Sequence, residues 1–181
     1  MEHKIIPVTN KENIPEEYRD NPIGLLFEYH NLNRQYDTYL QAQLLIGMCM
    51  DSRKHLHIPP NFAYIIRSGG ANLRYSEFKV AYAIAVGKVS HIALIGHNNC
   101  AMVNLASKKE EFINGLVDRA GWSRGAAEEC FMNHAPKFEI GNEIEFIVSE
   151  TNRLRKKYPK IMVASLYYKV EDNKLYFISE S

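Results

Sequence analysis

Three short apolar runs in the first hundred residues place the strongest constraint on how this chain can fold. They are QLLIGMC at 43–49, FAYII at 62–66 and HIALIG at 91–96. Uninterrupted runs of this length are typical of strands in the middle of a parallel sheet, which are buried on both faces. The pair Gly69-Gly70 breaks the chain after the second run. The sequence therefore predicts at least three neighbouring parallel strands.

Helical patterns occupy much of the rest of the chain. They cover residues 73–86, a segment opened by the capping-box pattern Ser107-x-x-Glu110, residues 124–134 and residues 141–157. The segments IMVASLYYKV and KLYFIS flank Glu171-Asp172-Asn173, which predicts a closing hairpin. This order predicts an α/β fold with a mainly parallel central β-sheet flanked by helices and a C-terminal edge hairpin.

Length and composition favour one domain over residues 1–181, because a chain of 181 residues buries one good core and shows no repeat or linker. Residues 1–40 are polar and helical in character, with a small apolar cluster. We interpret them as an N-terminal arm that packs against another surface.

The charges of the 22 basic and 21 acidic residues nearly cancel. This balance argues against nucleic acid and an anionic membrane as partners and favours a small or neutral one.

The cysteines indicate a reducing compartment. Cys49, Cys100 and Cys130 are odd in number and widely spaced, which does not suit a secreted disulfide framework. No apolar run reaches the roughly 18 residues of a membrane span. The segment MEHKIIPVTNKENIPEE is charged and lacks the apolar stretch of a signal peptide. We therefore expect a cytoplasmic protein.

A candidate metal site lies where the first and third runs end. Cys49 ends the first run, and Gly96-His97-Asn98-Asn99-Cys100 ends the third. The carboxyl ends of parallel strands open onto one crevice, so Cys49, His97 and Cys100 are expected to meet there. Two thiolates and an imidazole suit Zn²⁺, and three protein ligands leave the open position of a catalytic site.

Asp51 and Arg53 are candidate catalytic residues. They are two apart and point the same way in an extended turn, so an ion pair is expected. A carboxylate held by Arg53 beside an open zinc position can accept the proton of a zinc-bound hydroxide and aim its lone pair at a substrate. Alternatively, Asp51 swings round to occupy the fourth position itself and switches the site off. If the zinc is only structural, the pair only stabilises the fold.

Taken together, these motifs resemble the β-class carbonic anhydrases. The residues Cys-Met-Asp-Ser-Arg and the short chain are most similar to the compact microbial branch of that family. The resemblance is carried by Cys49-Met50-Asp51-Ser52-Arg53, by the turn Arg67-Ser68-Gly69-Gly70, by Gly96-His97-Asn98-Asn99-Cys100 and by the closing SLYYKVEDNKLYF. The turn is similar to the family's Arg-Asn-Ala-Gly. Together these segments cover most of the chain beyond residue 40.

The resemblance implies a fold, a reaction and an assembly. It makes Cys49, His97 and Cys100 the zinc ligands and Asp51 with Arg53 the catalytic dyad. The family hydrates CO₂ reversibly to bicarbonate through a zinc-bound hydroxide. Its N-terminal helices embrace a dimer partner, which matches the arm at 1–40 and implies a homodimer or a dimer of dimers.

Some departures from the family keep alternatives open. Ala101 stands where the family has glycine after the second zinc cysteine, and Ser68 stands where it has asparagine. The turn residues Ser68, Gly69 and Gly70 are candidates for substrate binding through backbone donors, although Gly-Gly after a strand also forms a plain turn. Related members of the fold hydrolyse carbonyl sulfide or carbon disulfide with the same ligands. The third hypothesis is a protein that binds zinc without catalysing a reaction.

Overall fold

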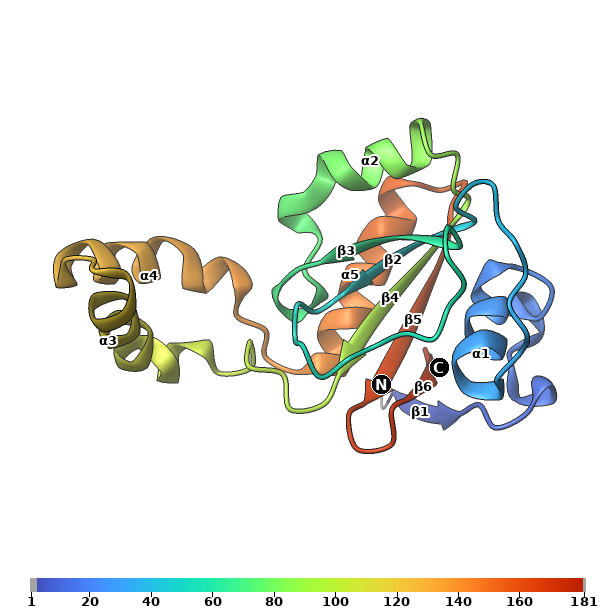
Figure 1. The fold of residues 1–181 in the computed structure, drawn as a ribbon, viewed down its shortest axis with the longest axis horizontal. Coiled ribbons are helices and arrows are strands. Elements are labelled where there is room, and N and C mark those ends of the chain that lie inside the picture. Colours follow the sequence, from blue (N-terminus) through green and yellow to red (C-terminus); the bar gives the residue numbers. More distant parts are fainter. Residues whose placement is uncertain (1–2, 181) are drawn as a thin grey trace.

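The structure, a computed structural model, describes residues 3–180 and confirms the predicted α/β sheet (Figure 1). Six strands form one sheet in the order β1-β6-β5-β4-β2-β3. The strands are β1 (Lys4–Pro7), β2 (Leu44–Met48), β3 (Ala63–Arg67), β4 (His91–His97), β5 (Met162–Lys169) and β6 (Lys174–Ser179). β3, β2, β4 and β5 run parallel, β6 returns antiparallel to β5 as the predicted hairpin, and β1 pairs antiparallel with β6.

Helices cover both faces of this sheet. They are α1 (Pro22–Leu32), α2 (Glu77–Ala85), α3 (Lys109–Ala120), α4 (Arg124–Phe138) and α5 (Glu143–Lys157). α1 packs on one face, and α2 with α5 packs on the other. α3 and α4 pack on each other and project away from the sheet as a helical hairpin (Figure 1).

The central strand β2 explains why the fold has a two-sided core. All of its residues are buried, and alternate side chains point to opposite faces. Ile46 and Met48 join the apolar cluster that includes Phe27 of α1, whereas Leu45 joins the cluster that includes Val80 of α2. An uninterrupted apolar run is therefore required here, because neither face of the strand meets solvent.

Two predicted features differ in the structure. The run at 62–66 was expected in the middle of the sheet, but β3 lies at its edge and leaves Tyr64 and Ile65 exposed, because no strand follows it in the order. The predicted capping box is wrong as well. Ser107 lies inside a 3-10 turn, Leu105–Lys108, that leads into α3, and its hydroxyl donates to Asn104 O instead of capping the helix.

The N-terminal segment belongs to the chain's own sheet. β1 extends the sheet beyond the hairpin and forms its edge, and of the described residues 3–40 only Pro22–Leu32 forms an α-helix. Asn31 fastens that helix: its Nδ2 donates to Val8 O at 2.9 Å and to Leu175 O at 2.7 Å, and its Oδ1 accepts from Leu175 N at 2.9 Å. Contact of residues 1–40 with a dimer partner stays a prediction.

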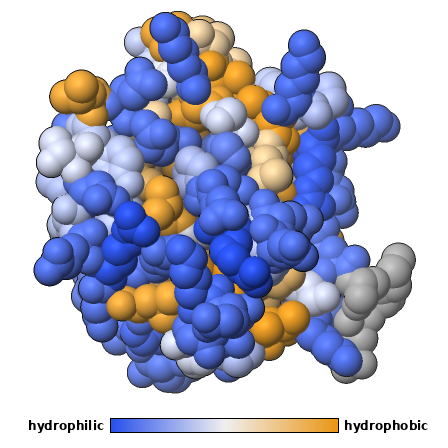
Figure 2. Space-filling model, turned by 90° about the vertical axis from the view of Figure 1, so that its right-hand side faces the viewer, coloured by the Kyte–Doolittle hydropathy of each residue, from blue (hydrophilic) through white to orange (hydrophobic). Residues whose placement is uncertain are grey.

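The side of the molecule that carries α1 is mainly hydrophilic, with separate small apolar groups (Figure 2). A surface of this kind is usual for a face that meets water. Among residues 3–180, no helix has both the length and the apolarity needed to cross a membrane.

A buried histidine in the last turn of α1 makes the fold sensitive to acid. His30 is 3% exposed, and its Nδ1 accepts a hydrogen bond from His57 N at 3.1 Å. Burial lowers the pKa of His30 to about 4, and the nearby charges of His57 and Lys174 act in the same direction. Its folded pKa therefore lies below the unfolded value of about 6.5.

We therefore expect the free energy of unfolding to fall as the pH drops from about 6.5 towards 4, since the unfolded chain then binds the additional proton. At pH 5 this single group costs about 2 kcal/mol. Urea unfolding at pH 7.5 and pH 5, compared between the wild type and His30→Gln, measures the effect. An equal pH dependence in both proteins would contradict it.

Candidate metal centre

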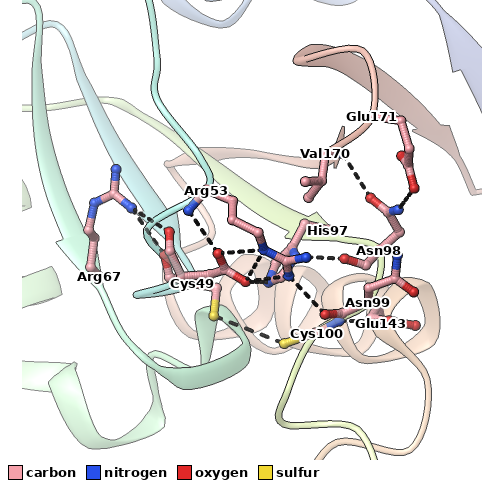
Figure 3. A network of polar contacts seen from close by, with 11 residues as sticks. Cys49, Arg53, Arg67, His97, Asn98, Asn99, Cys100, Glu143, Val170 and Glu171 are labelled. Carbon is pink, nitrogen blue, oxygen red and sulfur yellow. Dashed lines mark hydrogen bonds and ion pairs between the residues drawn. The ribbon is translucent and has the colours of Figure 1, made fainter.

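Cys49, His97 and Cys100 converge at the carboxyl ends of two neighbouring strands (Figure 3). Cys49 follows β2 directly, His97 is the last residue of β4, and Cys100 lies in the turn after it. Their candidate ligand atoms all lie within 4.8 Å of one another, and the two sulfurs are 4.0 Å apart. All three are buried, with exposures of 4%, 1% and 5%. The structure thus brings together the three residues that the sequence analysis selected.

The ring of His97 is oriented for metal binding. Its Nδ1 lies 2.9 Å from the carbonyl oxygen of Asn98, so Nδ1–H donates and Nε2 keeps its lone pair. Within residues 3–180, the buried Nε2 atom has no hydrogen-bond partner. A buried nitrogen is normally paired. An unpaired lone pair that faces two thiols therefore fits a metal ion, and a set of one imidazole and two thiols fits Zn²⁺.

The two thiols influence each other's ionisation. The contact between their sulfurs lowers the pKa of Cys49 and raises that of Cys100, because one proton between the sulfurs stabilises one thiolate and resists loss of the second. Burial raises the pKa of both thiols. A bound cation would offset the repulsion between two neighbouring thiolates, so that both sulfurs could lose their protons.

Asp51 and Arg53 form the predicted ion pair at the rim of the centre. Arg53 Nη2 donates to Asp51 Oδ2 at 2.6 Å, Arg53 Nε donates to Oδ1 at 3.0 Å, and the backbone N–H of Arg53 donates to Oδ1 at 2.9 Å. These hydrogen bonds hold the pKa of Asp51 well below its usual range. Asp51 Oδ2 lies 4.0 Å from His97 Nε2. An ionised carboxylate therefore lies next to the three candidate ligands.

Arg67 fixes the loop that carries these residues. Its guanidinium donates to three carbonyl oxygens, those of Cys49 at 3.3 Å, Asp51 at 3.4 Å and Lys54 at 3.0 Å. Arg53 also donates to Asn99 O at 3.0 Å, which ties the same loop to the turn after β4 (Figure 3). The loop after β2 is thus held from both sides by arginine side chains.

The turn after β3 lies against the same centre. Gly70 has φ +62°, a left-handed conformation that favours glycine. A Cβ on Gly69 would lie 2.8 Å from Met102 Sδ, so a side chain there displaces Met102. Gly70 lines a small hollow together with His97, Cys100 and Glu143. The backbone N–H of Ser68 already donates to Met48 O at 3.0 Å, so substrate binding by Ser68 would use other atoms.

Two supporting residues had no signal in the sequence. Glu143, at the start of α5, accepts a hydrogen bond from the backbone N–H of Cys100 at 3.3 Å. Asn98 accepts from the backbone N–H of Val170 at 2.9 Å and donates to Glu171 (Figure 3). These contacts attach the turn after β4 to α5 and to the closing hairpin. They join residues too far apart in sequence for a local pattern to reveal.

Known proteins share both the sequence pattern and the fold of this chain. A family model described as carbonic anhydrase matches residues 44–175. The β-carbonic anhydrase isoform I (TvaCA1) of the protozoan Trichomonas vaginalis superposes with a TM-score of 0.63 at 17% identity, covering 83% of this chain and 91% of that chain. The carbonic anhydrase of Glaciozyma antarctica gives a TM-score of 0.60 at 19% identity, covering 76% and 83%.

A third solved structure is that of a hydrolase. The apo form of a carbon disulfide hydrolase superposes with a TM-score of 0.54 at 20% identity, covering 75% of this chain and 77% of that chain. A comparison with curated proteins gives no match. At identities this low, the superpositions show a shared fold.

Cysteine substitution tests whether the cluster binds metal. We expect the protein to bind one equivalent of zinc and Cys49→Ser to lose most of it, because a serine hydroxyl stays protonated at neutral pH and is a poor ligand. The measurement is elemental analysis after dialysis against a weak chelator. Cys130→Ser is the matched control, since Cys130 lies on α4 outside the cluster. Full zinc in Cys49→Ser would exclude this thiol as a ligand.

Proposed function

Because the chain belongs to the carbonic anhydrase family, we propose that it is a zinc enzyme that interconverts CO₂ and bicarbonate. The observation that carries this proposal is the placement of the Asp51 carboxylate 4.0 Å from the unpaired Nε2 of His97. This geometry puts an acceptor beside a metal's open position. A purely structural metal site would not need it.

The zinc ligands in this proposal are Cys49 Sγ, His97 Nε2 and Cys100 Sγ. A Zn²⁺ ion held there supplies a Lewis acid that makes water a nucleophile near neutral pH. Asn98 fixes the His97 tautomer through its carbonyl oxygen, and Glu143 fixes the backbone of Cys100. We also propose a cytoplasmic location, since a site that depends on two reduced thiols suits a reducing compartment.

Asp51 orients the nucleophile in the proposed reaction. Arg53 keeps the carboxylate ionised, so both of its oxygens only accept hydrogen bonds. By accepting the hydrogen of the attacking oxygen, Asp51 aims a lone pair of that oxygen at the carbon of CO₂. Addition of water to CO₂ gives bicarbonate and one proton, which leaves to solvent. Gly70 lies next to His97 and Cys100, where its lack of a side chain lets the turn after β3 pack closely against the centre.

Hydrolysis of carbonyl sulfide or carbon disulfide is the second candidate. A cavity of about 320 Å³ has Met50, Gly69 and Met102, which neighbour residues of the centre in sequence, among its mostly apolar lining residues. An apolar cavity of this kind suits an uncharged sulfur substrate as well as it suits CO₂. The fold shared with a carbon disulfide hydrolase agrees with this alternative. Sulfide release without rapid CO₂ hydration would favour it, and full zinc with neither activity would favour a silent zinc-binding protein.

Stopped-flow CO₂ hydration on zinc-loaded protein tests the leading proposal. We expect rapid turnover in the wild type and a loss of at least about 100-fold in Asp51→Asn, since an amide cannot act as an anionic acceptor. Zinc content should be unchanged, because Asp51 is not one of the proposed ligands. Asp118→Asn on the exposed side of α3 is the matched control. Full activity in Asp51→Asn would refute the proposed role of the carboxylate.

We further propose that the enzyme is a homodimer whose interface includes β3 and α2. β3 is an edge strand with unpaired backbone groups, and its Tyr64 and Ile65 are 40% and 45% exposed. On the adjacent helix α2, Phe78 and Tyr82 are 81% and 49% exposed, and Val86, which follows the helix directly, is 59% exposed. A groove between the two elements is lined by Tyr64, Ile65, Phe78 and Tyr82, among other residues. An apolar edge of this extent fits a second copy of the same edge.

A charge placed in this face should separate the subunits. Phe78→Glu is expected to give a particle of one chain, 20.9 kDa, where the wild type has at least twice that mass, because burial of a carboxylate in an apolar interface is unfavourable. Light scattering after size-exclusion chromatography measures both masses. Ile6→Glu, on the opposite sheet edge, is the matched control. Dissociation by Ile6→Glu alone would place the interface on the other edge.

A further inference from the structure

Lys54 lies buried in the loop that carries the candidate catalytic residues. Its exposure is 0%, and among residues 3–180 its Nζ atom has no hydrogen-bond partner. Lysines are almost never fully buried without a partner, because desolvation of an ammonium group is costly. The usual explanation for a buried lysine stem, a charged end that reaches water, does not apply to a buried Nζ.

The charges near Lys54 are those of the metal centre. Cys49, Asp51 and Cys100 act on it attractively and raise its pKa, whereas burial lowers the pKa by more and Arg67 adds a smaller repulsion. The backbone of Lys54 is held in place by the hydrogen bond from Arg67 to its carbonyl oxygen at 3.0 Å. The same arginine therefore holds the backbone of Lys54 next to the backbones of Cys49 and Asp51.

Lys54 is not needed as the ion-pair partner of Asp51. Arg53 already donates to both oxygens of that carboxylate through Nε, Nη2 and its backbone N–H. A divalent cation held by Cys49 and Cys100 would be balanced by two thiolates, and Asp51 would be balanced by Arg53. Among residues 3–180, Arg67 donates only to carbonyl oxygens, so Lys54 and Arg67 then remain as the uncompensated positive charges of this group.

We propose that Lys54 gives the metal centre a net positive charge that attracts small monovalent anions, including the bicarbonate product. The inference rests on the proposed function, since bicarbonate is the product of that reaction. Coulomb attraction in a buried site needs no direct hydrogen bond, which agrees with the unpaired Nζ. The role assigned to Lys54 is electrostatic: it acts on the bound anion across the centre.

Anion titration of cobalt-substituted protein tests this role without measuring turnover. Co²⁺ replaces Zn²⁺ in the same ligand set, and thiocyanate binding is followed by the visible absorption of the metal. Lys54→Met keeps the length of the side chain and removes its charge. We expect thiocyanate to bind about tenfold or more weakly to this variant. Lys156→Met, at the exposed end of α5, should bind it as tightly as the wild type.

Thermal unfolding of the same proteins separates an electrostatic role from a packing role. Replacing an unpartnered buried ammonium with an apolar side chain should leave the melting temperature of Lys54→Met equal or higher. Lys54→Gln, a second uncharged variant, should also bind thiocyanate weakly. A lower melting temperature with unchanged thiocyanate affinity in both variants would overturn the inference.

The test also separates this inference from the proposed function. If the wild type takes up no Co²⁺, the metal centre itself is wrong and the role of Lys54 fails with it. If the wild type binds Co²⁺ and hydrates CO₂ while both Lys54 variants bind thiocyanate normally, only the role of Lys54 is refuted.

Discussion

Parallel pairing of β2 with β4 is the constraint on which the candidate centre depends. The register sets Met48 opposite Ile95, so the residues that follow each strand emerge side by side at one end of the sheet. Cys49 and His97 then meet without any long side chain having to reach across the molecule. The buried, apolar character of both strands fixes that register, because a shift by one residue would turn every core side chain to the opposite face.

Two arginine side chains hold the segments that follow β2 and β4 in fixed positions. Arg67 comes from β3, on the far side of β2, and binds carbonyl oxygens of the loop after β2. Arg53 belongs to that loop and binds both Asp51 and the turn after β4. A guanidinium suits this task because it stays charged and presents several donors in a fixed plane. The candidate metal ligands, the carboxylate and the backbone that carries them are thus positioned together.

Much of the fold and the site could be predicted from the sequence because their determinants are local. The runs that became β2 and β4 are apolar without interruption, and Asp51 and Arg53 are close enough in sequence to pair in any extended turn. The edge position of β3 could not be predicted in this way. Its sequence, FAYII, looks like a central strand, and its place depends on which strands lie beside it. The contribution of β1 to the sheet also depends on a pairing partner more than 160 residues away.

The burial of Lys54 is a feature that the sequence does not predict. In sequence, Lys54 follows Arg53 and precedes His55, and this run of basic residues predicts a turn exposed to solvent. Only the three-dimensional packing shows that Arg53 turns to Asp51 while Lys54 is enclosed. Since burial strengthens every charge in the centre, a single enclosed lysine can change which ligands the site retains. Residue type and spacing therefore identify the donors of the centre, whereas its net charge follows from tertiary structure.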